Sequence, residues 1–263
     1  MEIFVIANQK GGVGKTTTVL NLGASLARKG KKVLVIDLDP QANLSSGLGF
    51  TRQFDKNSWN EEDGAPYKNI YDVLINHVPL SKVFVTTSQE NLFLVPSHLS
   101  LAGAEIEMVN IIARETLLKK AISEFNQDID YILIDCPPSL SLLTINALTA
   151  SDYLIIPIQC EYFALEGLGQ LIQTTKLVKG INPNLQIGGI VLTMFDSRTR
   201  LSSNVVDDVR AHFKEKAFKT LVPRNVRLSE APSFGQSIFE YDNNSTGAKA
   251  YADLAQEFIK RFG

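Results

Sequence analysis

The chain has 263 residues, of which 44% are hydrophobic and 21% charged, and its formal net charge is −2 at pH 7. This composition is that of an ordinary globular protein and excludes the disordered, collagen-like and disulfide-scaffold classes. A near-neutral charge also argues against a nucleic-acid-binding protein, because such proteins are usually basic. There is no apolar run of membrane-spanning length and no secretory signal pattern, and the two cysteines favour a reducing cytoplasm.

Short β-branched runs alternate along the chain with longer amphipathic stretches. In chain order we expect strand Ile3–Ala7, helix Lys15–Arg28, strand Val33–Asp37, helix Ile70–His77, strand Leu92–Pro96, helix Glu105–Phe125, strand Tyr131–Asp135, strand Tyr153–Pro157, helix Leu165–Lys179, strand Ile187–Thr193, helix Ser203–Lys214, strand Phe218–Val222 and helix Ala248–Phe262. Apolar strands separated by helices predict a mostly parallel sheet with helices on both faces. We therefore expect one doubly wound α/β domain over residues 1–263, with a polar surface loop at 52–67.

A glycine-rich motif, NQKGGVGKTT, occupies residues 8–17. It follows a predicted strand and opens a predicted helix, which is the context that a phosphate loop requires. Glycines at this point allow successive backbone N–H groups to curl around phosphate oxygens, and the helix N-terminus adds its positive dipole end. Lys15 would reach the β- and γ-phosphates, the Thr16 hydroxyl would bind Mg²⁺, and Thr17 would make another phosphate contact. The nucleotide-binding residues expected here are Lys10, Gly11, Gly12, Val13, Gly14, Lys15, Thr16 and Thr17.

The motif departs from the standard phosphate loop at its first glycine. The pattern GxxxxGK[ST] requires glycine at position 9, where this chain has Gln9, followed by a second lysine, Lys10. Two lysines around one glycine cluster exceed what a single phosphate tail needs. A dinucleotide-binding loop is disfavoured, because the third glycine of GxGxxG is missing.

These residues resemble the deviant Walker A ATPases, and specifically the ParA/Soj chromosome- and plasmid-partitioning proteins. The resemblance extends over nearly the whole chain and is found in KGGVGKTT (10–17), DLDPQ (37–41), ILIDCPPSL (132–140), EYFALEGL (161–168) and VPRNVRLSEAPS (222–233). It implies a P-loop NTPase of the deviant Walker A type that forms an ATP-dependent homodimer. In such a dimer Lys10 would cross to the partner's nucleotide, so that Lys10, Lys15 and Asp39 are the expected catalytic residues.

Acidic residues end two of the predicted strands. Asp135 is similar to a Walker B aspartate that holds Mg²⁺ directly or through water, and Asp37 would support the same metal. In the resembled family Asp39 is expected to orient or activate the water that attacks the γ-phosphate. The simpler alternative is that these aspartates cap the turns that follow their strands.

Later segments supply the expected base contacts and switch loops. The resemblance places adenine near 192–196 and 222–225, so Pro223, Arg224 and Asn225 are expected to contact nucleotide; an ordinary loop is the alternative. Segments 39–49 and 137–150 are rich in Ser, Gly and Pro, and we expect loops there that become ordered on the γ-phosphate.

The charge of the chain is unevenly distributed. Residues 196–227 contain eight basic and four acidic residues, a net charge of +4, which leaves −6 for the remainder. A solvated helix face is the simple interpretation. The alternative is a patch that, doubled in a dimer, contacts DNA phosphates without reading bases. The candidates are Arg198, Arg200 and Arg227, followed by Lys214, Lys216 and Lys219.

The expected function is therefore an ATP- and Mg²⁺-dependent DNA-segregation switch. The family implies nonspecific binding of double-stranded DNA by the ATP dimer, stimulation of hydrolysis by a ParB/Spo0J-type centromere-binding protein, and a cytoplasmic, nucleoid-associated location. One alternative is a MinD-like membrane-associated ATPase, which would need a basic amphipathic tail beyond the last helix. Another is a metabolic enzyme or metal-cluster carrier with the same loop. We expect no membrane partner, and an apolar stripe on the last helix that packs on the protein's own sheet.

Overall fold

In the computed structural model, which describes residues 1–50, 67–162 and 168–263, the strands form one eight-stranded sheet in the order β3-β4-β2-β5-β1-β6-β7-β8. The strands are β1 (Glu2–Ile6), β2 (Val33–Asp37), β3 (Val85–Thr86), β4 (Leu92–Val95), β5 (Tyr131–Asp135), β6 (Tyr153–Gln159), β7 (Gln186–Phe195) and β8 (Ala217–Pro223). All neighbouring strands are parallel except β3 and β4. The expected doubly wound α/β fold is confirmed.

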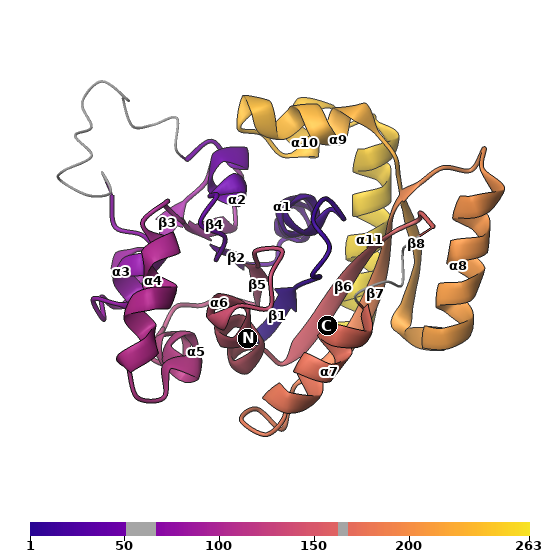
Figure 1. Cartoon of the computed structure of the whole chain (residues 1–263). Helices are drawn as coiled ribbons and strands as arrows, with labels where there is room; N and C mark the ends of the chain where they lie inside the picture. The colour runs from indigo at the N-terminus through magenta and orange to yellow at the C-terminus, as the bar shows by residue number, and fades with distance from the viewer. Residues whose placement is uncertain (51–66, 163–167) are drawn as a thin grey trace.

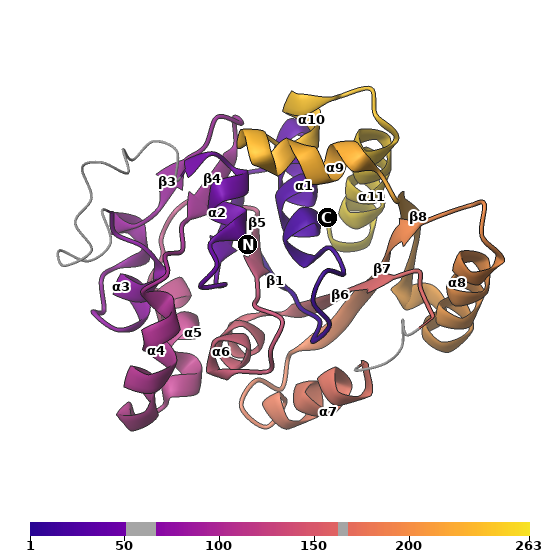
Figure 2. The ribbon, with the colours of Figure 1, turned by 45° about the horizontal axis from the view of Figure 1, so that its top comes forward.

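Helices cover both faces of this sheet (Figures 1 and 2). One layer contains α1 (Lys15–Arg28), α2 (Asn43–Gly47), α9 (Val226–Glu230), α10 (Ile238–Tyr241) and α11 (Thr246–Phe262). The other contains α3 (Ile70–Leu74), α4 (Leu101–Glu107), α5 (Leu117–Ser123), α6 (Leu142–Ala150), α7 (Leu168–Val178) and α8 (Arg200–Phe213). Because side chains alternate along a strand, each strand supplies both layers, as Val35 and Ile36 do in β2. The apolar stripe of α11 is buried against the sheet, as predicted.

The strand order creates a crevice at the carboxyl end of β1. Strands β2 to β5 all lie on one side of β1 in the sheet, and strands β6, β7 and β8 lie on its other side. Ligands of open α/β sheets bind at such switch points. Register places Ile6 of β1 and Asp37 of β2 each beside Asp135 of β5, so these three strands end together.

Three local predictions were wrong, and two short helices were missed. The expected helix 105–125 is interrupted: Ala113 has φ 57°, and two short 3₁₀ turns separate α4 from α5. The buried Asn146 side chain stabilises this break, because it accepts from Leu118 N (3.2 Å) and donates to the Arg114 carbonyl (2.8 Å). Segments 39–49 and 137–150 contain α2 and α6 where loops were expected, and α9 and α10 were not foreseen. The loop expected at 52–67 and the start of helix Leu165–Lys179 lie outside the described residues.

Candidate nucleotide site at the carboxyl edge of the sheet

The loop between β1 and α1 is held at both of its ends, by hydrogen bonds to β6 and β7. Asn8 donates to the Pro157 carbonyl of β6 (2.8 Å) and accepts from the Lys10 backbone N–H (3.0 Å). On the far side of the loop, Thr193 of β7 donates to the Val13 carbonyl (2.8 Å). Asn8 and Thr193 were not among the predicted site residues, and Thr193 is brought to the loop only by the tertiary fold.

Two of the loop's glycines are required by backbone conformation. Gly12 and Gly14 have φ values of 73° and 87°, in the left-handed region that glycine adopts without a Cβ penalty. Gly11 is different. Its φ is ordinary, it is exposed, and a Cβ built on it would lie 4.0 Å from the Pro138 Cβ, an ordinary contact.

Lys15 is a buried cation at the start of α1. Its side chain is 7% exposed, and its Nζ donates to the Lys10 carbonyl at 3.3 Å. Burial lowers the pKa of Lys15, while the charges of Asp135, Cys136 and Asp39 act in the opposite direction. The ammonium therefore lies within the loop, close to the acidic strand ends, and its donors converge on the space that the loop surrounds.

Asp135 is the acidic residue whose carboxylate has unused hydrogen-bonding capacity. It is fully buried, and in the described part of the chain neither oxygen has a partner at hydrogen-bonding geometry. Burial, followed by the charge of Asp37, raises the pKa of Asp135 well above its ordinary value, whereas the Thr16 hydroxyl and Lys15 lower it. A buried anion of this kind needs a counter-charge, and carboxylate and hydroxyl oxygens are ligands that Mg²⁺ accepts. Thr16 and Asp135 thus fit a magnesium ion held mainly by phosphate oxygens and water.

Asp37, by contrast, is engaged by the protein itself. One oxygen accepts from the Ser45 N–H (2.8 Å) and hydroxyl (2.7 Å), and the other accepts from the Asp39 N–H (3.2 Å). Burial raises the pKa of Asp37 to about 6. These bonds hold the first turn of α2 against the end of β2. The described residues contain no cluster of three or more His, Cys, Asp or Glu that could hold a metal alone.

Asp39 lies two residues beyond β2 and is 7% exposed. One of its oxygens accepts from the Gln41 N–H at 2.9 Å. This turn-capping bond is the simpler role that the sequence allowed, and it leaves the second carboxylate oxygen available for a water molecule.

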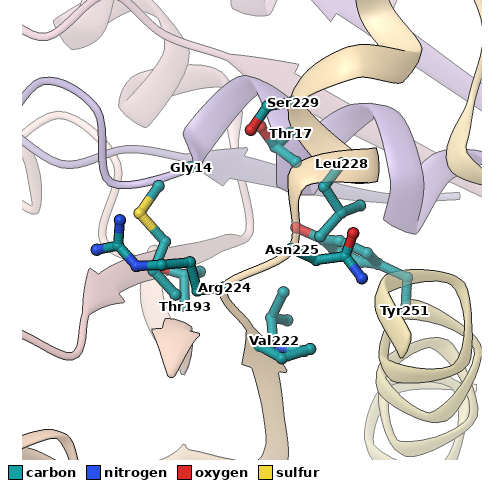
Figure 3. A pocket seen from close by; sticks show the side chains of 11 residues that line it. Gly14, Thr17, Thr193, Val222, Arg224, Asn225, Leu228, Ser229 and Tyr251 are labelled. Carbon is teal, nitrogen blue, oxygen red and sulfur yellow. The ribbon is translucent and has the colours of Figure 1, made fainter. Parts of the chain in front are cut away.

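A pocket of about 570 Å³ adjoins the loop where base contacts were expected (Figure 3). Its lining includes Gly14 and Thr17 from the loop and α1, Pro223 at the end of β8, and Arg224 and Asn225 just after it. The fold therefore brings the two predicted nucleotide segments together. Asn225 caps the N-terminus of α9: its Oδ1 accepts from the Arg227 N–H (2.8 Å), and its Nδ2 donates to Thr246 of α11 (2.7 Å).

Tyr251 and Asn21 connect this pocket to α10 and α11 and were missed by the sequence analysis. The Tyr251 hydroxyl, in the pocket lining, shares a 3.3 Å hydrogen bond with Thr18. Asn21 donates to the Thr17 carbonyl (2.9 Å) and accepts from the Ile238 N–H of α10 (2.8 Å). In the sequence both residues have the spacing of core helix positions and give no separate indication of a site.

Lys10 lines a second, more open hollow of about 990 Å³ rather than the base pocket. Glu161 and Asp196 contribute acidic groups there, and Arg224 borders both hollows and forms an ion pair with Glu161 (2.7 Å). The two lysines of the motif thus differ: Lys15 is buried inside the loop, and Lys10 faces a separate, open space.

The predicted DNA-binding residues do not form one patch. Arg198 and Arg200 follow the carboxyl end of β7, and Arg227 follows that of β8, at the same edge of the sheet as the phosphate loop. The three weaker candidates, Lys214, Lys216 and Lys219, lie at or near the amino end of β8, at the opposite edge. All six are exposed. Arg198 forms a two-pronged ion pair with Asp196 (2.7 and 2.9 Å), and Arg227 pairs with Glu230 (3.0 Å).

Comparisons with known proteins agree with this geometry. A family model described as "AAA domain" matches residues 1–187. The chain is 52% identical over 257 residues to the sporulation initiation inhibitor protein Soj of Bacillus subtilis, and this match covers 97% of each chain. It is 49% identical over 263 residues to the chromosome-partitioning ATPase Soj of Treponema pallidum, and this match covers 100% of this chain and 98% of the other.

Two solved structures share the fold and were crystallised with nucleotide. One is a Mycobacterium smegmatis protein titled cobyrinic acid a,c-diamide synthase, with ADP and magnesium (TM-score 0.82, 36% identity, 99% of this chain and 94% of that one). The other is a putative plasmid partition protein of Borrelia burgdorferi bound to AMPPNP (TM-score 0.81, 29% identity, 99% of each).

We predict that Asp135→Asn weakens the Mg²⁺ affinity of the nucleotide complex by about 10- to 100-fold, because it removes the carboxylate that faces Thr16. The free energy of unfolding without nucleotide should not fall, since the change removes a buried, unpaired charge. Titration of Mg²⁺ against a fluorescent ATP analogue measures the affinity. Asp128→Asn, at a fully exposed ion pair with Lys32, is the matched control, and equal Mg²⁺ affinity in all three proteins would contradict the assignment.

Proposed function

We propose that this chain, which belongs to the Soj/ParA family of chromosome-partitioning ATPases, is an ATP-driven DNA-segregation switch. The chain is an ATPase, and the finer proposal concerns how its states are used. An ATP-bound homodimer binds double-stranded DNA without sequence preference and leaves it after hydrolysis, which a ParB/Spo0J-type partner stimulates. The observation that supports this best is the separation of the two lysines, with Lys15 inside its own phosphate loop and Lys10 facing an open hollow.

In the proposed reaction, water attacks the γ-phosphate in line. Thr16 and Asp135, together with phosphate oxygens, would hold Mg²⁺, and the ion would supply charge neutralisation there. Lys15, already partly desolvated, places its ammonium against the β- and γ-phosphates. Asp39 orients the attacking water through the carboxylate oxygen that does not cap the turn, while Asp37 acts on the metal only indirectly, by fixing α2 and the Asp39 backbone. Gly11 to Thr17 hold the phosphates, and Pro223, Arg224 and Asn225 border the base.

Lys10 completes the site of a second copy. The half-buried Lys10 lines the open hollow and not the base pocket, and the exposed Gly11 follows it in the outer part of the loop. A partner packed against this edge receives Lys10 beside its γ-phosphate. Hydrolysis is then coupled to dimerisation, because the monomer lacks one cation.

The DNA surface is proposed at the edge of the sheet that holds the nucleotide. Arg198, Arg200 and Arg227 lie there, so that dimerisation through the same edge brings two such groups onto one assembly. Contacts of this kind are to phosphates and are salt-dependent. A cytoplasmic, nucleoid-associated location follows from this proposal.

The membrane-associated alternative has less support. No helix in the described ranges is long and apolar enough to cross a bilayer. The apolar face of α11 is occupied by the sheet, with Tyr251, Leu254 and Phe258 buried, so this helix has no free face for a lipid surface.

Lys10→Ala should bind ATP but lose hydrolysis by at least about 100-fold, because the cation supplied to the partner's γ-phosphate is missing. Phosphate release at several enzyme concentrations measures this. Lys29→Ala, at the other end of α1, should keep wild-type turnover. A Lys10→Ala enzyme with steady turnover independent of its concentration would contradict a role in trans.

Gly11→Val should fold and bind nucleotide but fail to form an ATP-dependent dimer. Within one chain the Cβ of the added side chain meets only an ordinary contact, and the position is exposed, so we expect the free energy of unfolding to change by no more than about 0.5 kcal/mol. At a dimer interface the same branched side chain prevents close approach. Light scattering in the presence of ATP measures whether the variant dimerises, and a normal ATP-dependent dimer would refute the proposed interface.

Replacing Arg198 and Arg200 together by Glu should weaken ATP-dependent DNA binding by at least about tenfold and flatten its salt dependence. Lys214→Glu with Lys216→Glu makes the same charge change at the opposite edge and should have a smaller effect. DNA co-sedimentation over a salt series measures both. Tight binding by the nucleotide-free monomer, or equal losses in the two double variants, would argue against this surface.

A further inference from the structure

The segment from Leu99 to Asn110, which contains α4, has two apolar faces, and only one of them is covered. Leu101, Ala104 and Met108 are buried in the core beneath the sheet. A second stripe repeats the same spacing: Leu99, Ala102, Ile106 and Val109 all point to solvent, with exposed fractions of 63% for Leu99, 77% for Ile106 and 56% for Val109. Ile112, just beyond, is 94% exposed. Ala102 and Ile106 are four residues apart in α4 and lie on one side of it. Leu99 precedes the helix, Val109 lies in the 3₁₀ turn Met108–Asn110 that follows it, and Ile112 lies beyond that turn.

A helix apolar on two sides is normally buried on two sides. Single exposed apolar side chains are common, but a continuous row of them indicates an interaction site. α4 lies beside α3 and α5 at the outer side of its layer (Figure 2). We call the surface formed by Leu99, Ala102, Ile106, Val109 and Ile112 the α4 stripe.

The charges around the α4 stripe are acidic. Helical spacing places Glu105 on one side of the stripe and Glu107 on the other, and residues 99–112 include no lysine or arginine. The Tyr71 hydroxyl donates to both Glu107 oxygens (3.0 and 3.1 Å), which holds this carboxylate in place. The nearby Arg114 is occupied by an ion pair with Glu115 (3.4 Å) and by the Val109 carbonyl.

The acidic border favours one of three possible binding partners for the α4 stripe: segment 51–66 of the same chain, a second copy of the chain, or a helix of another protein. Segment 51–66 of the same chain has four acidic and two basic residues, so it repels this border. A second copy placed on a two-fold axis here would set Glu105 and Glu107 against their own equivalents. A helix with an aliphatic stripe flanked by lysine or arginine matches both the apolar row and its acidic borders.

Glu105 also connects the α4 stripe to the nucleotide site. Its Oε1 accepts from the Leu143 N–H in the first turn of α6 (3.4 Å). The loop before α6 follows Asp135 and contains Pro138, which lies beside Gly11. A cation that drew Glu105 away would release the start of α6 and loosen this loop.

We propose that the α4 stripe binds a basic amphipathic helix of a partner protein, and that this binding changes the loop between Asp135 and α6. The binding step does not depend on the proposed partitioning role; the second step requires only that the chain hydrolyses ATP.

The probe for binding is a labelled synthetic helix of about 18 residues made of leucine, lysine and alanine, with leucines at i, i+3 and i+7. Fluorescence anisotropy with the full chain should show binding that Ile106→Ser with Val109→Ser weakens by at least about tenfold. Leu177→Ser with Ile181→Ser, which removes exposed apolar side chains elsewhere, should leave binding unchanged. The same peptide with glutamate in place of lysine should bind at least about tenfold more weakly.

Equal binding to both double variants, or equal binding of the two peptides, would overturn the docking surface. Loss of the ATP-dependent dimer in the Ile106/Val109 variant would also overturn it, because the occupant would then be a second copy. Saturating lysine peptide should change ATP turnover of the wild-type protein by at least about twofold, and unchanged turnover would overturn the connection through Glu105. DNA binding and dimerisation of the variants report separately on the proposed segregation function.

Discussion

The parallel register of β1, β2 and β5 forces charged groups into the interior at one edge of the sheet. Asp37 and Asp135 stand side by side at the ends of adjacent strands, and Lys15 begins the helix that follows the third. Burial is the main reason that the pKa values of both carboxyls are raised, and the charge of Asp37 raises that of Asp135 further. Asp37 accepts hydrogen bonds from Ser45 and from the backbone of Asp39. Asp135 has no partner at hydrogen-bonding geometry in the described part of the chain, and only the nearby Thr16 hydroxyl and Lys15 offset its burial. In the proposed function, a nucleotide-bound cation would offset the rest.

Hydrogen bonds also connect this edge of the sheet to the C-terminal helices. Asn21 joins the first turn of α1 to α10, Tyr251 joins it to α11, and Asn225 joins the base pocket to α11. These hydrogen bonds are 2.7 to 3.3 Å long, and those of Tyr251 and Asn21 are buried or partly buried, whereas that of Asn225 is exposed. They connect the first turn of α1 and the base pocket to the C-terminal layer that contains α9 and Arg227.

Sequence reasoning was accurate where a residue's environment is local. The phosphate loop, the strand ends and the alternation of strands and helices follow from glycine content, β-branched runs and helical spacing, and the structure places these elements as expected. It was inaccurate where a distant contact decides the local conformation. Asn146 stabilises a break in a stretch whose composition is helical. In α6 the polar residues Thr144, Asn146 and Thr149 are buried along with the apolar ones, so no solvent-facing polar side identifies it as a helix. Asp37 and Asp135 have equivalent positions in their strands, and only Ser45, eight residues beyond Asp37, distinguishes their roles.

The net charge of −2 acquires a different meaning once the residues are placed in space. Helix α8 runs from one edge of the sheet to the other and separates the basic residues of segment 196–227 into two groups. Arg198, Arg200 and Arg227 lie at the nucleotide edge, and Lys214, Lys216 and Lys219 lie at the opposite edge. A monomer therefore presents only a small cationic group at the proposed DNA surface, partly neutralised by Asp196 and Glu230. Few phosphate contacts give weak binding at physiological salt. In the proposed dimer, packing through the same edge would double this group and raise the number of contacts without any change in total composition, so that a near-neutral chain would make its DNA affinity depend on its nucleotide.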